Sequence, residues 1–467
     1  MAISEKARKM IWLLLCGFLL GGCAEDAEVS DRDERTVITV WTNSAWDLEY
    51  LRERADIYNR ENTQNIYLEV SLCSGNYEQA IEMADSLNEL PDILYADLDQ
   101  GSYYDFCRKG MFLELSPYLT QEQTEAFQGG ICTEVDESVY RIYSGADYGI
   151  LCYNKKILER CGITEPPGTM ADLAEMAKRI TRMLSGNGIY GFGQNMKDSA
   201  FDLCLTEHIA RDFGIYQGYD YRRGRYDFMV YETALGQMQA LLDEECAMPG
   251  CETLSMDALR ALFAQGKIAM YFGDSREERV YKNLFPAGAD SFGAAPFPTG
   301  GVSGCNGVVP VHFSGGWLVS SGSRNRQEAL TVLWEFFYSE EFLQGYYGDT
   351  AESRLFGDGM EKADLDMAAK AGCLPEAPHV INKNAVLTPG RDTYDVFYDI
   401  IYGDTEIKDG LQKLTESYNT AYCNGIRSES CGRLYLPEYQ PDDPEKTVDL
   451  YREMVLPLYR ANAANTN

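Results

Sequence analysis

The segment Thr36-Val-Ile-Thr-Val-Trp41 and the alternation that follows it decide the fold. Residues 36–41 are mostly β-branched and are bounded by Thr-Asn-Ser, which is typical of a buried strand. Apolar residues then recur at helical spacing over 48–58, in strand alternation over 66–72, at helical spacing over 80–87, and in a short run at 92–95. This strand–helix–strand–helix–strand order predicts an α/β fold with a largely parallel sheet.

Polar and aromatic residues follow the first and third of these strands. The first strand ends in Trp41-Thr-Asn43 and the third in Tyr95-Ala-Asp97. Open α/β sheets bind ligands at the carboxyl edge of their strands. We therefore expect both strand ends to open on the same ligand-binding edge.

A second unit is predicted after residue 144. Residues 149–153 have the pattern of a strand and 155–161 that of a helix. Thr169 with Asp172 forms a variant of the capping box at the start of another helix. Further helices are predicted at 231–244, 256–265, 326–338 and 407–422.

Composition excludes several classes of protein. The 467 residues are 24% charged and 45% hydrophobic, which is a globular composition. The 41 Lys and Arg stand against 73 Asp and Glu, for a formal net charge of −32. Because nucleic-acid binding needs a basic face that displaces counterions from phosphate, no nucleic-acid partner is expected.

The N-terminus has the pattern of an export signal. Lys6, Arg8 and Lys9 precede an apolar run over residues 10–20, which is short for a membrane span. The alternative is a membrane anchor that stays attached. Leu20-Gly-Gly-Cys23 resembles the bacterial lipobox, in which cleavage before the cysteine leaves a thiol that accepts lipid. We expect a signal peptide over 1–22 and lipidation of Cys23, which would hold the domain at the outer face of the bacterial membrane.

The cysteines and histidines give no metal signature. The 14 Cys include no Cys-x-x-Cys, and the 3 His have no metal-ligand spacing, so no metal and no cofactor are expected. Export would permit disulfides, for instance Cys246/Cys251 or Cys423/Cys431. Buried free thiols are an equal alternative, since many of these cysteines are flanked by core-like residues.

Several segments, in this order, resemble the extracellular solute-binding proteins (family 1) of ABC importers, the relatives of maltose-binding protein. They are Pro91-Asp-Ile-Leu-Tyr-Ala-Asp97, Lys109-Gly-Met-Phe-Leu-Glu-Leu115, Asp147-Tyr-Gly-Ile-Leu-Cys-Tyr-Asn-Lys155, Phe263-Ala-Gln-Gly-Lys-Ile-Ala-Met270, Gly293-Ala-Ala-Pro-Phe-Pro298 and Gly315-Gly-Trp-Leu-Val319. Each segment alone is weak, whereas the ordered set together with the lipobox is specific. The match thins out after about residue 345.

The resemblance implies a two-lobe clamp of the periplasmic-binding-protein type (type II), which closes about a hinge over a ligand. The expected division is a lipidated Cys and tether at 23–35, a first lobe at 36–143 and 296–340, a second lobe at 144–295 and 341–460, and a tail at 461–467. Crossing segments are expected near 143–146, 293–298 and 339–345. The implied partners are a carbohydrate and an ABC permease, and we expect a monomer.

Sugar rings stack on aromatic faces, and their hydroxyls need charged or amide partners. By position at the strand ends, the candidate ligand-binding residues are Trp41, Asn43, Trp46, Tyr95, Asp97 and Asp99. By the resemblance, they are Asp147, Tyr148, Asn195, Phe272 and Asp274. Trp317, which follows the double glycine, and Tyr394 are two further candidates. Alternatively, Trp41 packs in the core, Asp99 caps a helix and Trp317 packs between the lobes.

Enzyme motifs do not have the context they need, and no enzymatic activity is expected. Gly186-Asn-Gly-Ile-Tyr-Gly191 satisfies G-x-G-x-x-G, but it lies after a predicted helix and before a predicted strand, the reverse of a dinucleotide loop. A glycosidase needs only two nearby carboxylates, which so many acidic residues could supply by chance. A surface glycan hydrolase or lyase therefore stays an alternative, as does a ligand-sensing subunit of a signalling receptor.

Overall fold

The computed structural model describes residues 35–98, 100–119, 132–135, 138–147, 149–196, 215, 218–220, 222–298, 309–347, 353–354, 361–362, 373–375, 390–428, 435 and 437–438. The predicted signal peptide, Cys23, residues 24–34, Asp99, Tyr148 and the tail lie outside the described residues.

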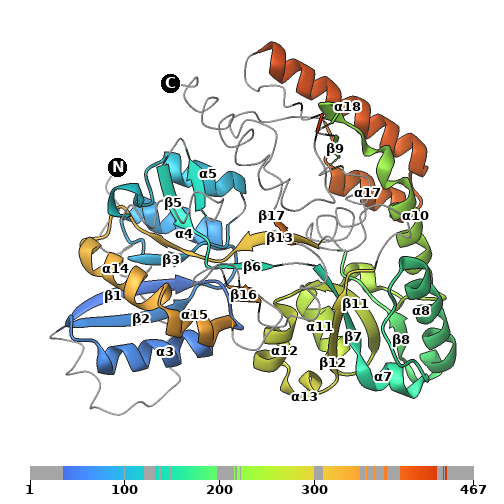
Figure 1. Cartoon of the computed structure of the whole chain (residues 1–467), viewed down its shortest axis with the longest axis horizontal. Helices are drawn as coiled ribbons and strands as arrows, with labels where there is room; N and C mark the ends of the chain where they lie inside the picture. The colour runs from blue at the N-terminus through green and yellow to red at the C-terminus, as the bar shows by residue number, and fades with distance from the viewer. Residues whose placement is uncertain are drawn as a thin grey trace, which may run out of the picture.

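The first lobe is built on a four-stranded sheet in the order β14–β3–β1–β2 (Figure 1). β1 (Thr36–Thr42) runs parallel to β2 (Ile66–Leu72) and to β3 (Ile93–Tyr95). β14 (Trp317–Val319), from much later in the chain, pairs antiparallel with β3. The predicted parallel α/β arrangement is confirmed, and one antiparallel strand completes it.

Helices flank this sheet. The apolar residues of α3, α14 and α15 form one core with β1, while those of α4 and α5 form a second cluster with Leu94 of β3. Ile38 and Val40 of β1 are fully buried, and Leu51 and Ala55 of α3 pack against them at i, i+4 spacing. The helices are α3 (Leu48–Glu61), α4 (Tyr77–Leu87), α5 (Gln100–Arg108), α14 (Arg326–Val332), which continues as a π-helical turn at Leu333–Phe337, and α15 (Glu340–Tyr347). A 3₁₀ turn at Ser116–Tyr118 and a hairpin of β4 (Cys132–Val135) and β5 (Ser138–Ile142) complete the lobe.

The position of α15 differs from the predicted lobe boundary at residue 340. Phe342, Leu343, Tyr346 and Tyr347 of this helix pack in the same core as β1. The Tyr50 hydroxyl of α3 also donates to the Phe342 carbonyl at 2.9 Å. The first lobe therefore extends at least to the end of α15.

The second lobe has a mixed sheet in the order β12–β7–β11–β8. β7 (Gly149–Asn154) is antiparallel to both β11 (Ile268–Asp274) and β12 (Phe292–Pro296), while β8 (Tyr190–Phe192) is parallel to β11. The helices of this lobe are α7 (Lys155–Arg160), α8 (Met170–Leu184), α10 (Glu232–Leu241), α11 (Met256–Ala264), α12 (Glu277–Leu284) and α13 (Pro286–Ala289), with 3₁₀ turns at Ser185–Asn187 and Cys251–Thr253. Thr169 caps α8 as predicted, accepting from the Asp172 amide at 3.1 Å.

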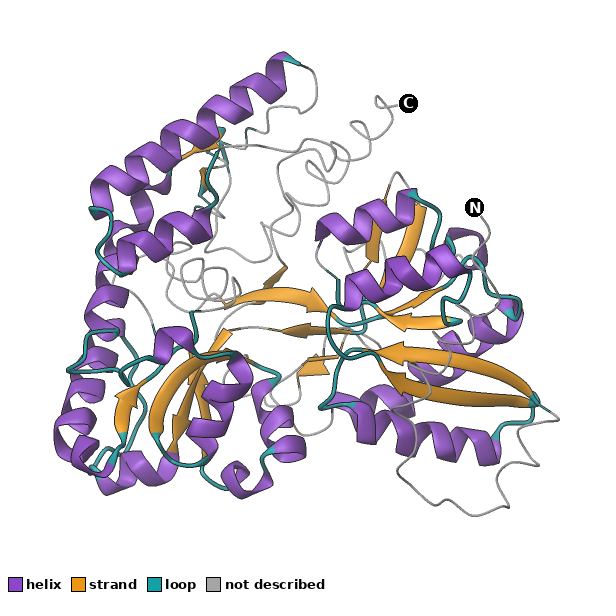
Figure 2. Cartoon of the chain, turned by 180° about the vertical axis from the view of Figure 1, so that it is seen from behind, coloured by secondary structure: helices purple, strands orange, loops and turns teal. Residues whose placement is uncertain are grey.

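Two C-terminal helices extend the second lobe (Figure 2). α17 (Thr393–Ile401) and α18 (Ile407–Arg427) pack against α10, next to a small hairpin of β9 (Tyr219–Asp220) and β10 (Arg225–Tyr226) and a 3₁₀ turn at Phe228–Tyr231. Their apolar residues belong to the same core as those of α8 and α10.

A third sheet, in the order β16–β15–β6–β13–β17, lies between the lobes (Figure 1). Its strands are β6 (Gly145–Asp147), β13 (Val309–Ser314), β15 (Ser353–Arg354), β16 (Glu361–Lys362) and β17 (Cys373–Pro375). β6 pairs antiparallel with both β13 and β15. These strands connect the two halves of the clamp.

Two of the three segments predicted to cross between the lobes lie within a lobe instead. The segment 293–298 is mostly β12, an edge strand of the second lobe, and the crossing that follows it is β13. The segment 339–345 lies in α15, within the first lobe. The segment 143–146 overlaps β6, in agreement with the prediction.

Gly315 and Gly316 join the crossing strand β13 to β14 of the first lobe. Both have positive φ, 68° and 101°. A Cβ at Gly316 would lie 2.4 Å from the Ile142 carbonyl oxygen. Only glycine fits this close approach, and its φ lies where other residues are strained.

The cysteines whose state is described are free thiols: Cys73, Cys107, Cys152, Cys161, Cys246, Cys251 and Cys423. Cys246 and Cys251 are both buried and do not pair with each other. The structure therefore favours buried thiols over this disulfide.

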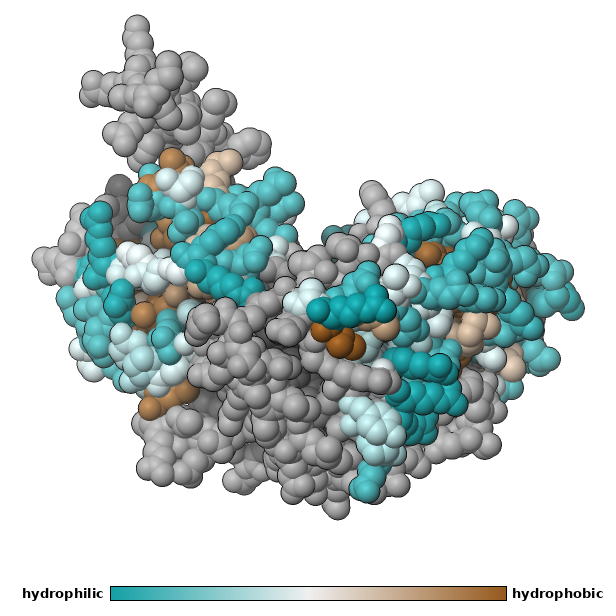
Figure 3. All heavy atoms as spheres, turned by 90° about the horizontal axis from the view of Figure 1, so that it is seen from above, coloured by the Kyte–Doolittle hydropathy of each residue, from teal (hydrophilic) through white to brown (hydrophobic). Residues whose placement is uncertain are grey.

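The described surface is largely hydrophilic on both lobes in the view of Figure 3, with small separate apolar patches. Within the described residues, no helix combines the length and the apolar character needed to cross a membrane.

Candidate functional site

The ends of β1 and β3 meet at one edge of the first sheet, as predicted. The Asn43 Nδ2 donates to Asp97 Oδ2 at 2.9 Å, so a side chain after β1 contacts one after β3. Asp97 is exposed and Asn43 is half-buried. Parallel strands bring their carboxyl ends to one edge, which is why the sequence could predict this contact.

Trp41 lies partly in the core. It is half-buried and packs against the cluster that contains Tyr77 and Leu94. The Tyr77 hydroxyl donates to the Tyr95 carbonyl at 3.1 Å, which ties α4 to this edge. The packing favours the alternative that Trp41 packs in the core, although part of its surface stays accessible.

Trp317 is a core residue. Only 2% of its surface is exposed, and its ring stacks on Phe337 with centroids 3.8 Å apart. The Tyr95 ring lies against it in a T-shaped arrangement, with centroids 5.1 Å apart. The expectation that Trp317 contacts ligand is not supported by this packing, because almost none of its surface is exposed.

Tyr95 stands where the two lobes approach each other. Burial raises the pKa of its hydroxyl, and the charges of Asp97 and Asp47 in the first lobe and of Arg276 and Arg279 in the second also act on this pKa. The phenol therefore stays protonated and can donate a hydrogen bond. Groups from both lobes thus lie within electrostatic range of one hydroxyl.

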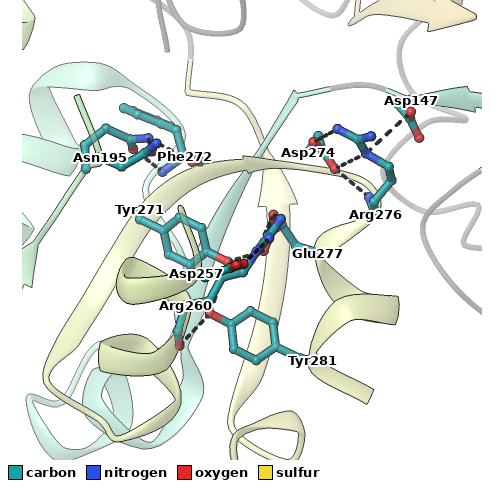
Figure 4. A network of polar contacts seen from close by, with 11 residues as sticks. Asp147, Asn195, Asp257, Arg260, Tyr271, Phe272, Asp274, Arg276, Glu277 and Tyr281 are labelled. Carbon is teal, nitrogen blue, oxygen red and sulfur yellow. Dashed lines mark hydrogen bonds and ion pairs between the residues drawn. The ribbon is translucent and has the colours of Figure 1, made fainter. Parts of the chain in front are cut away.

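Asp147 and Asp274 share one guanidinium at the crossing (Figure 4). Arg276 Nη2 lies 2.7 Å from Asp274 Oδ2, and its Nε lies 3.6 Å from Asp147 Oδ2. The Ser275 hydroxyl donates to Asp147 Oδ1 at 3.4 Å. Two residues predicted separately, on β6 and β11, are therefore brought together by an arginine that the sequence analysis did not select.

The acid–base properties of this group follow from the ion pair. Burial alone would raise the pKa of Asp274, but the charge and hydrogen bonds of Arg276 outweigh it, so the pKa lies below its ordinary value. The charge of Asp274 in turn raises the pKa of Arg276. The Arg276 side chain is 38% exposed, so it can still donate to a solute.

Asn195 and Phe272 lie together but are buried. Gln194 connects them: its Nε2 donates to Asn195 Oδ1 at 3.1 Å, and its Oε1 accepts from the Phe272 amide at 2.9 Å. The Phe272 ring stacks on Phe297, with centroids 4.5 Å apart. Both residues are therefore buried within the second lobe and do not face its surface.

Tyr394 holds the neighbouring segment in place. Its hydroxyl donates to the Met196 carbonyl at 2.6 Å, which joins α17 to the chain that follows β8. Tyr394 therefore contacts the residue that follows Asn195, from a helix that packs against α10 and α18.

The lobes also meet at Trp46, whose ring was predicted to stack on a sugar. Instead the guanidinium of Arg279, from α12, lies 4.5 Å from the centre of that ring. Arg279 Nη1 lies 3.4 Å from Asp47 Oδ1. The sequence analysis missed Asp47 and Arg279, because neither strand ends nor the resemblance pointed to them.

A buried network anchors α12 within the second lobe (Figure 4). Glu277 is fully buried and accepts from Arg260 Nη2 at 2.6 Å and from the Tyr271 hydroxyl at 2.7 Å. The Tyr281 hydroxyl donates to the Arg260 carbonyl at 3.2 Å. This network fixes the start of α12, the helix that carries Arg279 and follows Arg276.

The described part of the chain contains no group of three or more His, Cys, Asp or Glu that could hold a metal ion. The candidate site combines hydrogen-bond donors and acceptors from both lobes with the phenol of Tyr95. Recognition of a polar solute requires groups of these kinds.

Comparison with known proteins identifies the family. Residues 53–352 match the profile of the bacterial extracellular solute-binding proteins, and the chain belongs to this family. A Brucella abortus protein named only as a binding protein is 24% identical over 285 residues, which are 58% of this chain and 66% of that protein. The match therefore spans slightly less than two thirds of this curated relative.

Solved structures show the same fold. An ABC transporter solute-binding protein from Thermotoga lettingae, bound with alpha-D-tagatose, has a TM-score of 0.64 at 18% identity, covering 83% of this chain and 99% of that one. A maltose/maltodextrin-binding domain from Bdellovibrio bacteriovorus, bound to maltotriose, has a TM-score of 0.60 at 16% identity, covering 84% and 100%. The predicted two-lobe, type II binding-protein fold is thereby confirmed.

Proposed function

We propose that this protein captures a carbohydrate of oligosaccharide size between its lobes outside the cell and delivers it unaltered to an ABC importer. The observation that carries the proposal is a set of hydrogen-bonding groups at the sheet edge and at the crossing. Asn43 contacts Asp97 at 2.9 Å in the first lobe, and Arg276 of the second lobe lies 3.6 Å from Asp147 on the crossing strand. The tagatose- and maltotriose-bound neighbours share the fold and support a sugar ligand.

Binding would use groups of complementary kinds. Asp97 and Asp147 accept hydrogen bonds from sugar hydroxyls, Arg276 and Asn43 donate them, and the phenol of Tyr95 does either. A ligand that contacts both lobes stabilises the closed clamp only by as much as it prefers that form. The proposed binding cycle is reversible closure of the two lobes over the solute, without covalent chemistry.

We further propose that Cys23 carries lipid and holds the protein, as a monomer, on the outer face of the membrane. The support is the lipobox-like Leu20-Gly-Gly-Cys23 behind an apolar run. Mass spectrometry of the N-terminal peptide should show a chain that begins at an acylated Cys23. In Cys23→Ser, residues 1–22 should stay attached and no lipid should be present. A wild-type protein without lipid on Cys23 would contradict the anchor.

A thermal-shift screen tests the binding function. Mono- and oligosaccharides, including tagatose, maltose and maltotriose, would be added to the purified protein. A ligand at about 100 times its Kd should add about 2.7 kcal/mol to the free energy of unfolding. Chromatography of the same mixtures should show unchanged sugar, whereas cleavage products would indicate a glycan hydrolase or lyase.

A further inference from the structure

The side chain of Arg279, a second-lobe residue in the first turn of α12, lies in a pocket of the first lobe. Only 6% of Arg279 is exposed. Its guanidinium carbon lies 4.5 Å from the ring centre of Trp46 and 3.8 Å from that of Tyr346. Its Nη1 reaches Asp47 Oδ1 at 3.4 Å and the Tyr346 carbonyl at 3.2 Å.

The first lobe forms this pocket from two separate segments. Asp47 is 2% exposed, and its Oδ2 accepts from the Ser44 hydroxyl at 2.7 Å and from the Tyr346 hydroxyl at 2.6 Å. Both bonds lie within the first lobe and join the residues after β1 to α15. The position of the carboxylate is therefore set by first-lobe contacts as well as by Arg279.

A second contact lies one turn further along α12. Asn283 Nδ2 donates to the Trp46 carbonyl at 3.0 Å. Residues four apart lie on one face of a helix, so Arg279 and Asn283 present a single face of α12 to the first lobe. In Figure 1, α12 is accordingly the second-lobe helix beside α15.

Burial makes this contact different from a surface ion pair. Exposed pairs contribute little, because water and salt screen them. Separating the lobes would take the guanidinium away from Asp47, and this carboxylate would lose the charge that offsets its burial, which is costly. Stacking of the guanidinium on two rings adds to the preference for the joined lobes.

We propose that Arg279 and the pocket formed by Trp46, Asp47 and Tyr346 are an interlobe latch, which holds the lobes together without solute and sets the affinity of the site around Tyr95. The latch itself is a property of the unliganded chain, and only its effect on affinity rests on the proposed function. When the binding-competent form is a fraction of the population, the apparent affinity falls by that fraction. Opening the latch should therefore weaken binding of a ligand in the site around Tyr95.

Small-angle X-ray scattering of the unliganded, signal-free protein tests the latch directly. Arg279→Met keeps the length of the side chain but removes its charge and planarity, and Asp47→Asn removes the opposite charge. Both variants should show a larger radius of gyration than the wild type, and Arg279→Lys an intermediate one. Equal radii in all four proteins would overturn the latch.

Arg54→Met is the matched control. Arg54 lies two turns along α3 from Asp47, and its Nη2 pairs with Glu341 Oε1 at 2.6 Å, but both residues belong to the first lobe. The radius of gyration of Arg54→Met should equal that of the wild type. An equal increase in this variant would show a general loosening of the first lobe and would also overturn the latch.

Calorimetric titration with a sugar found in the thermal-shift screen tests the effect on affinity. Arg279→Met and Asp47→Asn should bind about 5- to 150-fold more weakly, the range typical of coupling between sites. Unchanged or tighter binding by variants whose scattering shows separated lobes would overturn the link to affinity. If no sugar binds the wild type, the proposed function fails, whereas the scattering result on the latch stands.

Discussion

The Asp147 carboxylate lies 3.6 Å from the Arg276 guanidinium, which joins the crossing strand β6 to the residue just before α12. Asp147 also accepts from Ser275 at 3.4 Å. Only 6% of Asp147 is exposed, and we propose that this carboxylate at the crossing accepts a hydrogen bond from a solute between the lobes. This position makes it the most informative single residue of the proposed site.

Asp147→Asn should weaken carbohydrate binding by about tenfold or more, because a hydrogen bond to a charged acceptor contributes about 1.5–3 kcal/mol. Calorimetric titration measures the effect. Asp409→Asn is a matched control, since Asp409 pairs with Lys413 at 2.7 Å on the exposed face of α18, away from the crossing. Normal binding by Asp147→Asn would remove Asp147 from the site.

The pH dependence of stability tests the Asp274–Arg276 pair. The pKa of Asp274 is lowered in the folded protein, so between that value and the unfolded pKa of about 3.9 the unfolded chain binds more protons. The stabilisation by Asp274 is thus present above about pH 4 and is lost as the pH falls through the folded pKa.

Urea unfolding of the wild type and of Asp274→Asn should therefore differ by about 1 kcal/mol at neutral pH, a modest value because Arg276 is partly exposed. The difference should stay constant down to about pH 5 and shrink below about pH 4. If the difference in unfolding free energy stayed unchanged below about pH 4, the charge of Asp274 would not be what stabilises the Asp274–Arg276 segment.

The sequence predicted the first half of the first lobe well. The alternation of strand and helix patterns from Thr36 to Tyr95 is local, and it appears in the structure as β1, α3, β2, α4 and β3. The contact of Asn43 with Asp97 followed from one general property of parallel sheets. Local periodicity and a topological rule were sufficient for these features.

What the sequence could not predict depends on contacts between distant segments. Nothing in the helical pattern of α15 says which lobe it joins, because an apolar face can pack on either core. Arg279 enters the first lobe 232 positions after Asp47, and no spacing rule encodes such a pair. Trp317 shows the same limit, since large aromatic residues serve equally in cores and in sugar sites.

The two tryptophans near Tyr95 should behave differently on substitution. Trp317→Ala should cost about 3–5 kcal/mol of unfolding free energy, because it leaves a cavity beside Phe337. Trp317→Phe should lose less stability and bind sugar normally, since the ring is buried in the core of the first lobe. Chemical unfolding and calorimetric titration measure the two effects. A Trp317→Phe protein that is fully stable but no longer binds sugar would show that Trp317 contacts the ligand.

The buried Arg260–Glu277 pair gives a double-mutant test of how α12 is held. Removing either partner leaves the other charge buried, so Glu277→Leu and Arg260→Met should each cost about 3–5 kcal/mol of unfolding free energy. The double variant leaves no buried charge and should be more stable than the sum of the two losses predicts. Urea unfolding of the four proteins measures the coupling. Strictly additive losses would mean that the two side chains do not depend on each other, and that the contacts of Tyr271 and Tyr281 fix α12 without the ion pair.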